Sequence, residues 1–258
     1  MEEVQKYSTD NRFLLSEMVK RDFKKRYHHS VLGVCWSVMN PFLTYLIMRL
    51  VFTYFFGRNI PHYSTYLFSG VILFSYFSQV TNSGMTIYIS NRRYIERVNL
   101  PPYLYLLSKN LAMFIDFLMT FVAFLIMAAI DGIRFGPHML ALLFPMLCMA
   151  ILCYGAGHIL AVVYIYFRDF GHIYSLILVF LRYGSAIFYD ISSLPASYQR
   201  IFYLNPLYLN IRYFRGVVIE ETIPSLSYHL LMAGISVFVL IIGIMVYKHN
   251  RYKLVYNF

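Results

Sequence analysis

The run YLYLLSKNLAMFIDFLMTFVAFLIMAAI, residues 103–130, is apolar along almost its whole length. A bilayer's hydrocarbon core is about 30 Å thick, so a spanning helix needs about 20 mostly apolar residues. Five similar segments surround this one, at about 31–57, 65–90, 138–165, 171–189 and 226–247. Because 59% of the 258 residues are hydrophobic and 13% are charged, the sequence predicts an all-α membrane protein with six transmembrane helices. They form a single domain over 31–258, preceded by a cytoplasmic part, 1–30.

Lysine and arginine side chains are unevenly distributed between the two sides of these spans. Fourteen of them lie in residues 1–30, in the loop 91–97, at Arg168 and in residues 248–253. The opposite loops carry five, namely Arg58, Arg134, Arg200, Arg212 and Arg215. The positive-inside rule therefore predicts a multi-pass protein with both termini in the cytoplasm. We attribute the net charge of +10 to this topology and to anionic lipid. Nucleic acid is excluded as a partner because no soluble basic domain is large enough to bind it.

Two segments outside the spans are expected to be helical. Residues 11–29 form a basic amphipathic helix, which before a membrane span typically lies in the interface; a solvated basic stalk is the alternative. Its apolar face consists of Leu14, Leu15, Met18, Val19 and Phe23. Residues 190–225 contain two apolar-aromatic runs, 198–204 and 207–219, broken at Asn205-Pro206. They predict a helical hairpin that re-enters the outer leaflet without crossing it, with an amphipathic surface loop as the alternative.

Four charged residues fall inside the predicted spans, where charges usually face a partner or a wet cavity. Lys109 is near the cytoplasmic end of its span and can snorkel. Arg49 and Asp116 are candidates for a pair between helices, either as structural glue or as pathway lining. Arg182 lies near the suspected hairpin and is expected to meet either a phosphate or a cluster of carbonyl groups.

Two arginines of the predicted hairpin, Arg212 and Arg215, are three residues apart and would share a helix face. This face could guide phosphate or snorkel to lipid.

Aromatic residues make up 19% of the chain. Belts at the two membrane interfaces explain many of them, and others are expected to line a path for sugars, whose ring faces stack on aromatic side chains. The remaining pathway or gate candidates are polar or aromatic: Tyr27, Trp36, Tyr183, Tyr189, Asn205 and Tyr208. Prolines are expected to kink two spans, at Pro41 and Pro145, and small residues at 33/37 and 157/161 to permit close helix contact.

The sequence contains no nucleotide-binding or hydrolytic motif. G-x-x-x-x-G-K-[ST], G-x-S-x-G, H-E-x-x-H and C-x-x-C are all missing, so no P-loop holds ATP here. The three cysteines, Cys35, Cys148 and Cys153, fall inside predicted spans and are expected to pack there. We predict no catalytic residue, no metal site and no cofactor in this chain, and therefore not an enzyme.

Four stretches carry a family resemblance: RDFKKRYHHSVLGVCWSVMNP at 21–41, NRRYIERVNLPP at 91–102, YFRDFGHI at 166–173 and NPLYLNIRYFRG at 205–216. Together they resemble the membrane subunits of polysaccharide ABC exporters, in the ABC-2 type permease group that includes the O-antigen and wall teichoic acid exporters. The resemblance implies a homodimer in the bacterial cytoplasmic (inner) membrane, with two copies of a cytoplasmic ATPase that bind ATP and Mg²⁺. The implied cargo is a polysaccharide on undecaprenyl diphosphate.

The resemblance also implies which segments contact the ATPase: the interfacial helix and the loop after the second span, with the turn 166–173 as a further match. The coupling candidates are Arg21, Asp22, Lys24, Arg26, Arg92, Arg93, Tyr94, Glu96, Arg97, Arg168 and Asp169. The resemblance further implies that the hairpin 190–225 forms an outer gate. An ABC-2 exporter of drugs or lipids is the alternative with the same fold. A membrane enzyme that modifies lipid-linked sugars is the alternative from another class.

Overall fold

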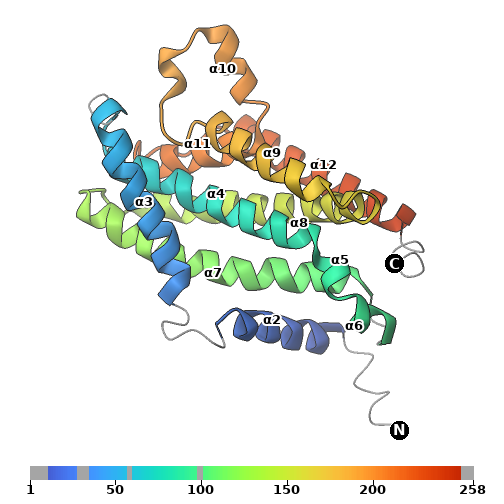
Figure 1. Ribbon diagram of the computed structural model, residues 1–258. Coiled ribbons are helices and arrows are strands. Elements are labelled where there is room, and N and C mark those ends of the chain that lie inside the picture. Colours follow the sequence, from blue (N-terminus) through green and yellow to red (C-terminus); the bar gives the residue numbers. More distant parts are fainter. Residues whose placement is uncertain (1–10, 28–34, 57–59, 98–100, 251–258) are drawn as a thin grey trace.

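The computed structural model describes residues 11–27, 35–56, 60–97 and 101–250, which contain helices and no strand (Figure 1). The first helices along the chain are α2 (Asn11–Tyr27), α3 (Cys35–Phe56), α4 (Tyr63–Met85), α5 (Ile87–Ser90) and α6 (Arg92–Arg97). They are followed by α7 (Tyr103–Ile130), the 3₁₀ turn η1 (Pro137–Leu142), α8 (Leu143–Tyr166) and α9 (Phe170–Gly184). The last are η2 (Ile191–Ser193), α10 (Ala196–Phe202), α11 (Pro206–Val218) and α12 (Leu226–Asn250).

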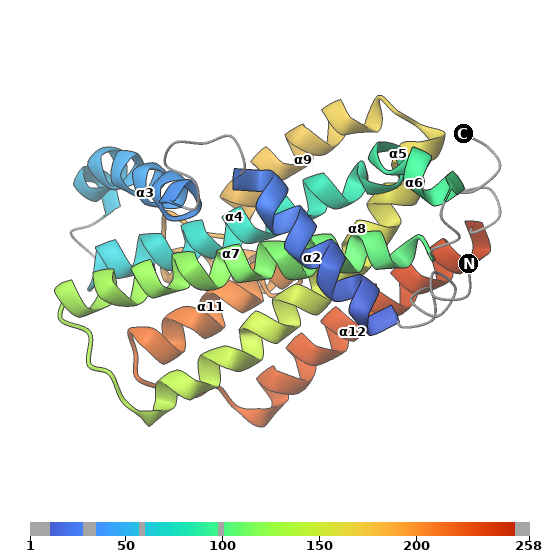
Figure 2. The ribbon, with the colours of Figure 1, turned by 90° about the horizontal axis from the view of Figure 1, so that it is seen from below.

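Helices α4, α7, α8, α9 and α12 run roughly along one axis, and each predicted span contains a helix (Figures 1 and 2). Three are long and apolar enough to cross a membrane, at Tyr103–Ile130, Pro137–Tyr166 and Leu226–Asn250. Val38–Val51 and Phe170–Gly184 are shorter apolar helices. The prediction of an all-α membrane protein is confirmed, and the crossing of the membrane six times stays a prediction.

We call the end of the bundle with α5, α6 and residues 167–169 the inner end, and the end with residues 131–136 and α10 the outer end (Figure 1). Helix α4 lies at the centre and packs against α3, α7, α8 and α11. Seventeen of its 23 residues are buried. Aromatic rings join it to its neighbours, with the ring of Phe68 at 4.8 Å from Tyr45 and 6.0 Å from Phe124.

The closest helix contact joins α8 and α12. A Cβ atom added to Gly243 would lie 2.3 Å from the carbonyl oxygen of Gly155, which only glycine permits. Of the predicted small pairs, Gly157 faces the Leu106 side chain of α7 instead, and the 33/37 pair lies outside the described side chains. Spacing alone does not show which of several glycines meets a partner, because each helix has more than one neighbour.

The predicted proline kinks need one correction. Pro41 lies inside α3, as expected. Pro145 is the third residue of α8, directly after η1. The first backbone N–H groups of a helix have no partner within it, so proline at this position interrupts no hydrogen bond.

Helix α2 crosses α7 near the inner end (Figure 2). Met18 on its apolar face is buried with Ile95, Leu104 and Tyr105, whereas Lys24 on its other face is exposed. The apolar face of the predicted amphipathic helix therefore packs against other helices of the same protein. The predicted contact of α2 with the membrane surface stays a prediction.

The segment 190–225 folds as a helical hairpin, and the surface-loop alternative is wrong. Its helices α10 and α11 are separated at Asn205-Pro206, where the Asn205 side chain accepts a hydrogen bond from Leu207 N and caps α11. Eleven of the thirteen residues of α11 are buried, against α4, α8, η1 and α12. Helix α10 projects to one side of the bundle, above α11 (Figure 1).

Candidate transport pathway and coupling surface

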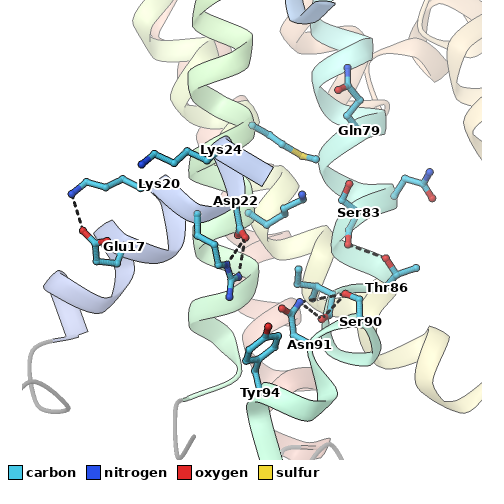
Figure 3. A pocket seen from close by; sticks show the side chains of 15 residues that line it. Glu17, Lys20, Asp22, Lys24, Gln79, Ser83, Thr86, Ser90, Asn91 and Tyr94 are labelled. Carbon is cyan, nitrogen blue, oxygen red and sulfur yellow. Dashed lines mark hydrogen bonds and ion pairs between the residues drawn. The ribbon is translucent and has the colours of Figure 1, made fainter. Parts of the chain in front are cut away.

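A cleft of about 1240 Å³ opens at the inner end of the bundle, between α2, α4 with its continuation α5–α6, and α7. Figure 3 shows residues of α2 on one side and polar residues of α4 and α5 on the other. We call this space the inner cleft. All of its lining residues except Ile87 and Met113 are polar or charged. The full lining consists of Glu17, Lys20, Arg21, Asp22, Lys24, Gln79, Asn82, Ser83, Thr86, Ile87, Ser90, Asn91, Tyr94, Lys109 and Met113.

A polar stripe along α4 and α5 forms one wall of this cleft. It runs through Ser75, Gln79, Ser83, Thr86 and Ser90, at intervals of three or four residues that place them on one helix face. The sequence reasoning did not identify these residues, although their spacing inside a predicted span was the available signal. They also explain why α4 is not among the most apolar helices.

The stripe continues past the cleft as two narrow cavities. Gln79 also lines a cavity of about 20 Å³ with Asp116 and Pro41, and Ser75 joins that cavity to one of about 10 Å³ beside Arg182. Each has room for about one water molecule. The predicted pathway residues Asp116 and Arg182 therefore lie beside one row of three separate cavities that share the stripe residues Gln79 and Ser75. We call this row the polar track; it is wide at the inner end and narrow in the middle.

Four cations and two carboxylates line the inner cleft, which gives it an excess of positive charge. Lys20 pairs with Glu17 at 2.8 Å, and Arg21 with Asp22 at 2.8 Å. Asp22 also accepts a hydrogen bond of 3.0 Å from Ser108 of α7, which fixes α2 to the bundle. Cations combined with amides and hydroxyls suit a ligand that carries both anionic and hydroxyl groups.

The coupling candidates gather at the inner end. The Arg21 guanidinium lies 5.9 Å from the centre of the Tyr94 ring, so α2 and α6 meet through a cation–π contact. Arg93 is exposed on α6, and Arg168 and Asp169 are exposed in the turn between α8 and α9. Arg26, Glu96 and Arg97 are in α2 and α6, but their side chains lie outside the described part, as does that of the pathway candidate Tyr27.

Among the other pathway candidates, the structure does not join Arg49 to Asp116. Within the described residues, the Arg49 guanidinium donates to Tyr45 of its own helix at 3.2 Å. Asp116 is buried on α7. Trp36 is 46% exposed at the start of α3. The two residues of the expected pair therefore have separate environments, because α3 turns the Arg49 side chain toward the preceding helical turn.

At the outer end, backbone carbonyl groups hold the hairpin to the bundle. Asn205 of the hairpin donates to Gly184 O at 3.0 Å. Directly before the hairpin, Tyr189 donates from its hydroxyl to Tyr183 O at 2.8 Å. Arg182, predicted to meet phosphate or carbonyls, lies with its guanidinium 5.0 Å from the Phe74 ring centre. Tyr183 is exposed near it.

Arg212 and Arg215 both line one pocket at the outer end, but they are held in different ways, and a role in guiding phosphate stays a prediction. Arg215 is 3% exposed and donates to Tyr66 O, Ala186 O and Ile187 O, the last two at 2.9 Å. Its guanidinium lies 3.4 Å from the Tyr66 ring centre. Arg212 is partly exposed and pairs with Glu220. Burial makes Arg215 a structural group that joins α11 to α4 and to the residues after α9.

No group of three or more His, Cys, Asp or Glu side chains within the described ranges is arranged to hold a metal ion. The apolar helices and the polar cleft between them define the class of a membrane-embedded helical protein. The sequence matches the ABC-2 type transporter family over residues 14–219. The chain belongs to this family of transporters, and the expectation of a transport component rather than an enzyme is confirmed.

Several curated proteins are similar over nearly the whole chain. The O-antigen export system permease protein RfbA of Myxococcus xanthus is 26% identical over 246 residues, which cover 93% of each chain. A protein of the same name from Klebsiella pneumoniae is 24% identical, again over 93% of each chain. The polysialic acid transport protein KpsM of Escherichia coli is 25% identical over 95% of this chain and 94% of its own length.

Proposed function

We propose that this chain is the permease subunit of an ATP-driven exporter for a lipid-linked cell-surface polysaccharide. The inner cleft carries the proposal, because its cations suit a diphosphate and its amides and hydroxyls suit sugars. The names of the O-antigen and polysialic acid relatives support a glycan cargo. We infer an undecaprenyl diphosphate carrier, on which the glycan is an O-antigen, a teichoic acid or a related polymer.

The permease works as a homodimer with two copies of a cytoplasmic ATPase, which bind ATP and Mg²⁺. Two features of the described residues support the dimer. Helix α9 has a single buried residue, Tyr174, and α3 exposes Leu46, Ile47 and Leu50. These faces suit a second copy or lipid, and a two-fold axis beside them encloses a wider channel than one chain can.

The protein resides in the bacterial cytoplasmic membrane with both termini in the cytoplasm. ATP binding closes the ATPase dimer against α2, α6 and the turn after α8. The movement passes through α2 to α7 at the hydrogen bond between Ser108 and Asp22. The polar track then widens, and the glycan moves outward. Such coupling requires two arrangements whose balance both ATP and the cargo change.

The polar track favours glycan export over export of an apolar drug or lipid, since hydroxyls and amides in a membrane-embedded wall suit a hydrated cargo. An enzyme that modifies lipid-linked sugars would need clustered acid and base groups, which the inner cleft lacks beyond Glu17 and Asp22.

Purification with the cognate ATPase tests the proposal. We expect the chain alone to hydrolyse no ATP, and a stable four-subunit complex to hydrolyse it. Mass spectrometry of lipid bound to the complex should identify an isoprenoid diphosphate that carries a glycan. Robust ATP hydrolysis by the chain alone, or a drug or phospholipid as the exported cargo, would contradict the proposal.

A further inference from the structure

A second pocket, which the polar track does not reach, lies at the outer end under the hairpin. It has a volume of about 380 Å³, within the range of about 300–1,000 Å³ that is typical of small-molecule sites. We call it the outer pocket. Its polar walls come from the residues after α9, from both hairpin helices and from the chain after α11, and include Asp190, Gln199, Tyr203, Tyr208, Arg212 and Glu220.

Two of the three tyrosines that line this pocket form a fixed corner. The rings of Tyr203 and Tyr208 are perpendicular, with their centres 5.6 Å apart, and the Phe202 ring supports Tyr208 at 5.6 Å. Within the described part of the chain, no residue hydrogen-bonds to the hydroxyl of Tyr203 or Tyr208. Rigid rings with available hydroxyls provide apolar contact and hydrogen bonds to the same ligand.

The charges of the outer pocket balance, unlike those of the inner cleft. Two arginines, Arg212 and Arg215, face two carboxylates, Asp190 and Glu220. Carbonyl oxygens bind the buried Arg215 guanidinium, and Arg212 pairs with Glu220. A phosphate here would meet two carboxylates with little free positive charge, which is unfavourable. A neutral ligand with many hydroxyl groups has no such penalty.

Planar polar side chains around such a ligand can bind neighbouring hydroxyls in pairs. Arg212 has further N–H donors beside the one that Glu220 accepts. Gln199 donates to Leu194 O at 2.8 Å, which fixes its amide at the pocket wall. Asp190 is fixed by hydrogen bonds from Ser192. The donors and acceptors are therefore held in place before any ligand arrives.

We propose that the outer pocket binds one neutral sugar residue of the glycan as it leaves the permease. This inference rests on the proposed function and adds a binding site to it. A sugar held there keeps the emerged part of the chain outside while the inner end returns to its loading state.

Photo-crosslinking in cells that make the glycan tests the site. A photoreactive amino acid replaces Gln199 in the outer pocket, Tyr198 next to it, or Ser83 in the inner cleft. Tyr198 is exposed and does not line the outer pocket, so it is the matched control. Each variant is purified with its ATPase, and the covalent glycan is detected by sugar staining. We expect adducts at positions 83 and 199 and none at 198.

The outcomes separate the two proposals. An adduct at 83 without one at 199 would overturn the outer pocket and leave the export function standing. No adduct at any position would overturn the proposed function, and the outer pocket with it. Equal adducts at 198 and 199 would also overturn the site, because contact would then be unspecific.

Charge neutralisation distinguishes a sugar from a phosphate or an anionic lipid headgroup. Glu220→Gln removes a carboxylate from the outer pocket, and Glu221→Gln removes the neighbouring carboxylate, which does not line it. With a neutral sugar as ligand, Glu220→Gln should lower the adduct at position 199 by roughly tenfold, because it removes the carboxylate that pairs with Arg212 and that lines the pocket as an acceptor for a sugar hydroxyl. Glu221→Gln should leave it unchanged. An increase with Glu220→Gln would indicate an anionic ligand and overturn the proposal.

Discussion

The inner cleft and the outer pocket use the same residue types in opposite ways. The inner cleft is about three times larger, with volumes of 1240 and 380 Å³, and has more cations than carboxylates. Its Arg21 side chain is 40% exposed and pairs with the neighbouring Asp22. In the outer pocket, Arg215 is 3% exposed and is bound by backbone carbonyls.

This difference shows that burial decides what a charge does. An exposed ion pair contributes little to stability because water and salt screen it, so its charges remain available to a ligand or partner. Desolvation disfavours a buried cation and lowers the pKa of Arg215, so its hydrogen bonds to the carbonyls are needed to keep it in place. The Arg21 side chain at the inner end is solvent-exposed and therefore accessible to a ligand or partner, whereas Arg215 holds the structure together.

The largest effect is expected at Arg215. Arg215→Met should destabilise the fold by roughly 3 kcal/mol or more, because several buried carbonyl oxygens lose their donor. The thermal midpoint and the yield in detergent measure this. Arg212→Gln, on the same helix, should lower stability by less than about 1 kcal/mol. If Arg215→Met melts like the wild-type protein, Arg215 is not a structural group.

A smaller effect, on export alone, is expected in the inner cleft. Lys20→Glu with Lys24→Glu should lower glycan export by roughly tenfold or more, because positive charge that attracts an anionic cargo is reversed. Both side chains are exposed on α2, so folding and assembly should persist. Lys20→Arg with Lys24→Arg keeps the charge and is the control. Unchanged export in the Glu variant would mean that these lysines only set the topology.

Coupling to the ATPase is tested at α6. Arg93→Glu with Arg97→Glu should weaken assembly with the ATPase, or separate hydrolysis from export, by roughly tenfold, because reversed charges repel the partner surface. Co-purification and ATP hydrolysis measure this. The same reversal at the outer end, Arg134→Glu with Arg200→Glu, changes two exposed residues and should leave both quantities unchanged. Equal effects at the two ends would refute a specific coupling surface on α6.

Cysteine labelling, which should disturb the protein least, tests which end of the bundle faces the outside of the cell. A cysteine at Ser197, exposed on α10, should react with a membrane-impermeant reagent added to cells, and a cysteine at Asn91 should not. Cys35 is exposed, so the background carries Cys35→Ser. Labelling at 91 from outside would invert the topology and exchange the roles of the inner cleft and the outer pocket.

Much of the architecture could be predicted because bilayer thickness imposes a length on apolar helices. The six apolar segments each contain a helix, and the break at Asn205-Pro206 separates α10 from α11. The family also followed from local sequence, in the stretch 21–41 and the three stretches after it, and the match over residues 14–219 confirmed it. These features depend on residues close together in the chain.

The candidate site was predictable only in part. The coupling candidates of α2 and α6 came from the resemblance, and the structure brings Arg21 and Tyr94 together; their role in coupling stays a prediction. The polar stripe on α4 was missed although its spacing was readable, because serine and threonine are common in apolar helices and only the packing of α4 shows that this face borders a cleft. Arg49 and Asp116 were candidates for a pair, yet a pair between helices depends on how each helix is rotated about its axis.

The sequence by itself determined the class of fold, the family and the positions of the helices, because hydrophobic length, charge asymmetry and turn residues act locally. Only the tertiary structure decided that Gly155 meets Gly243, that Arg215 is buried among carbonyl groups, and that Asp190, Tyr208 and Glu220 line one pocket. Those relations join residues far apart in the chain. They depend on the packing of one helix against another, which fixes burial and therefore the role of each charge.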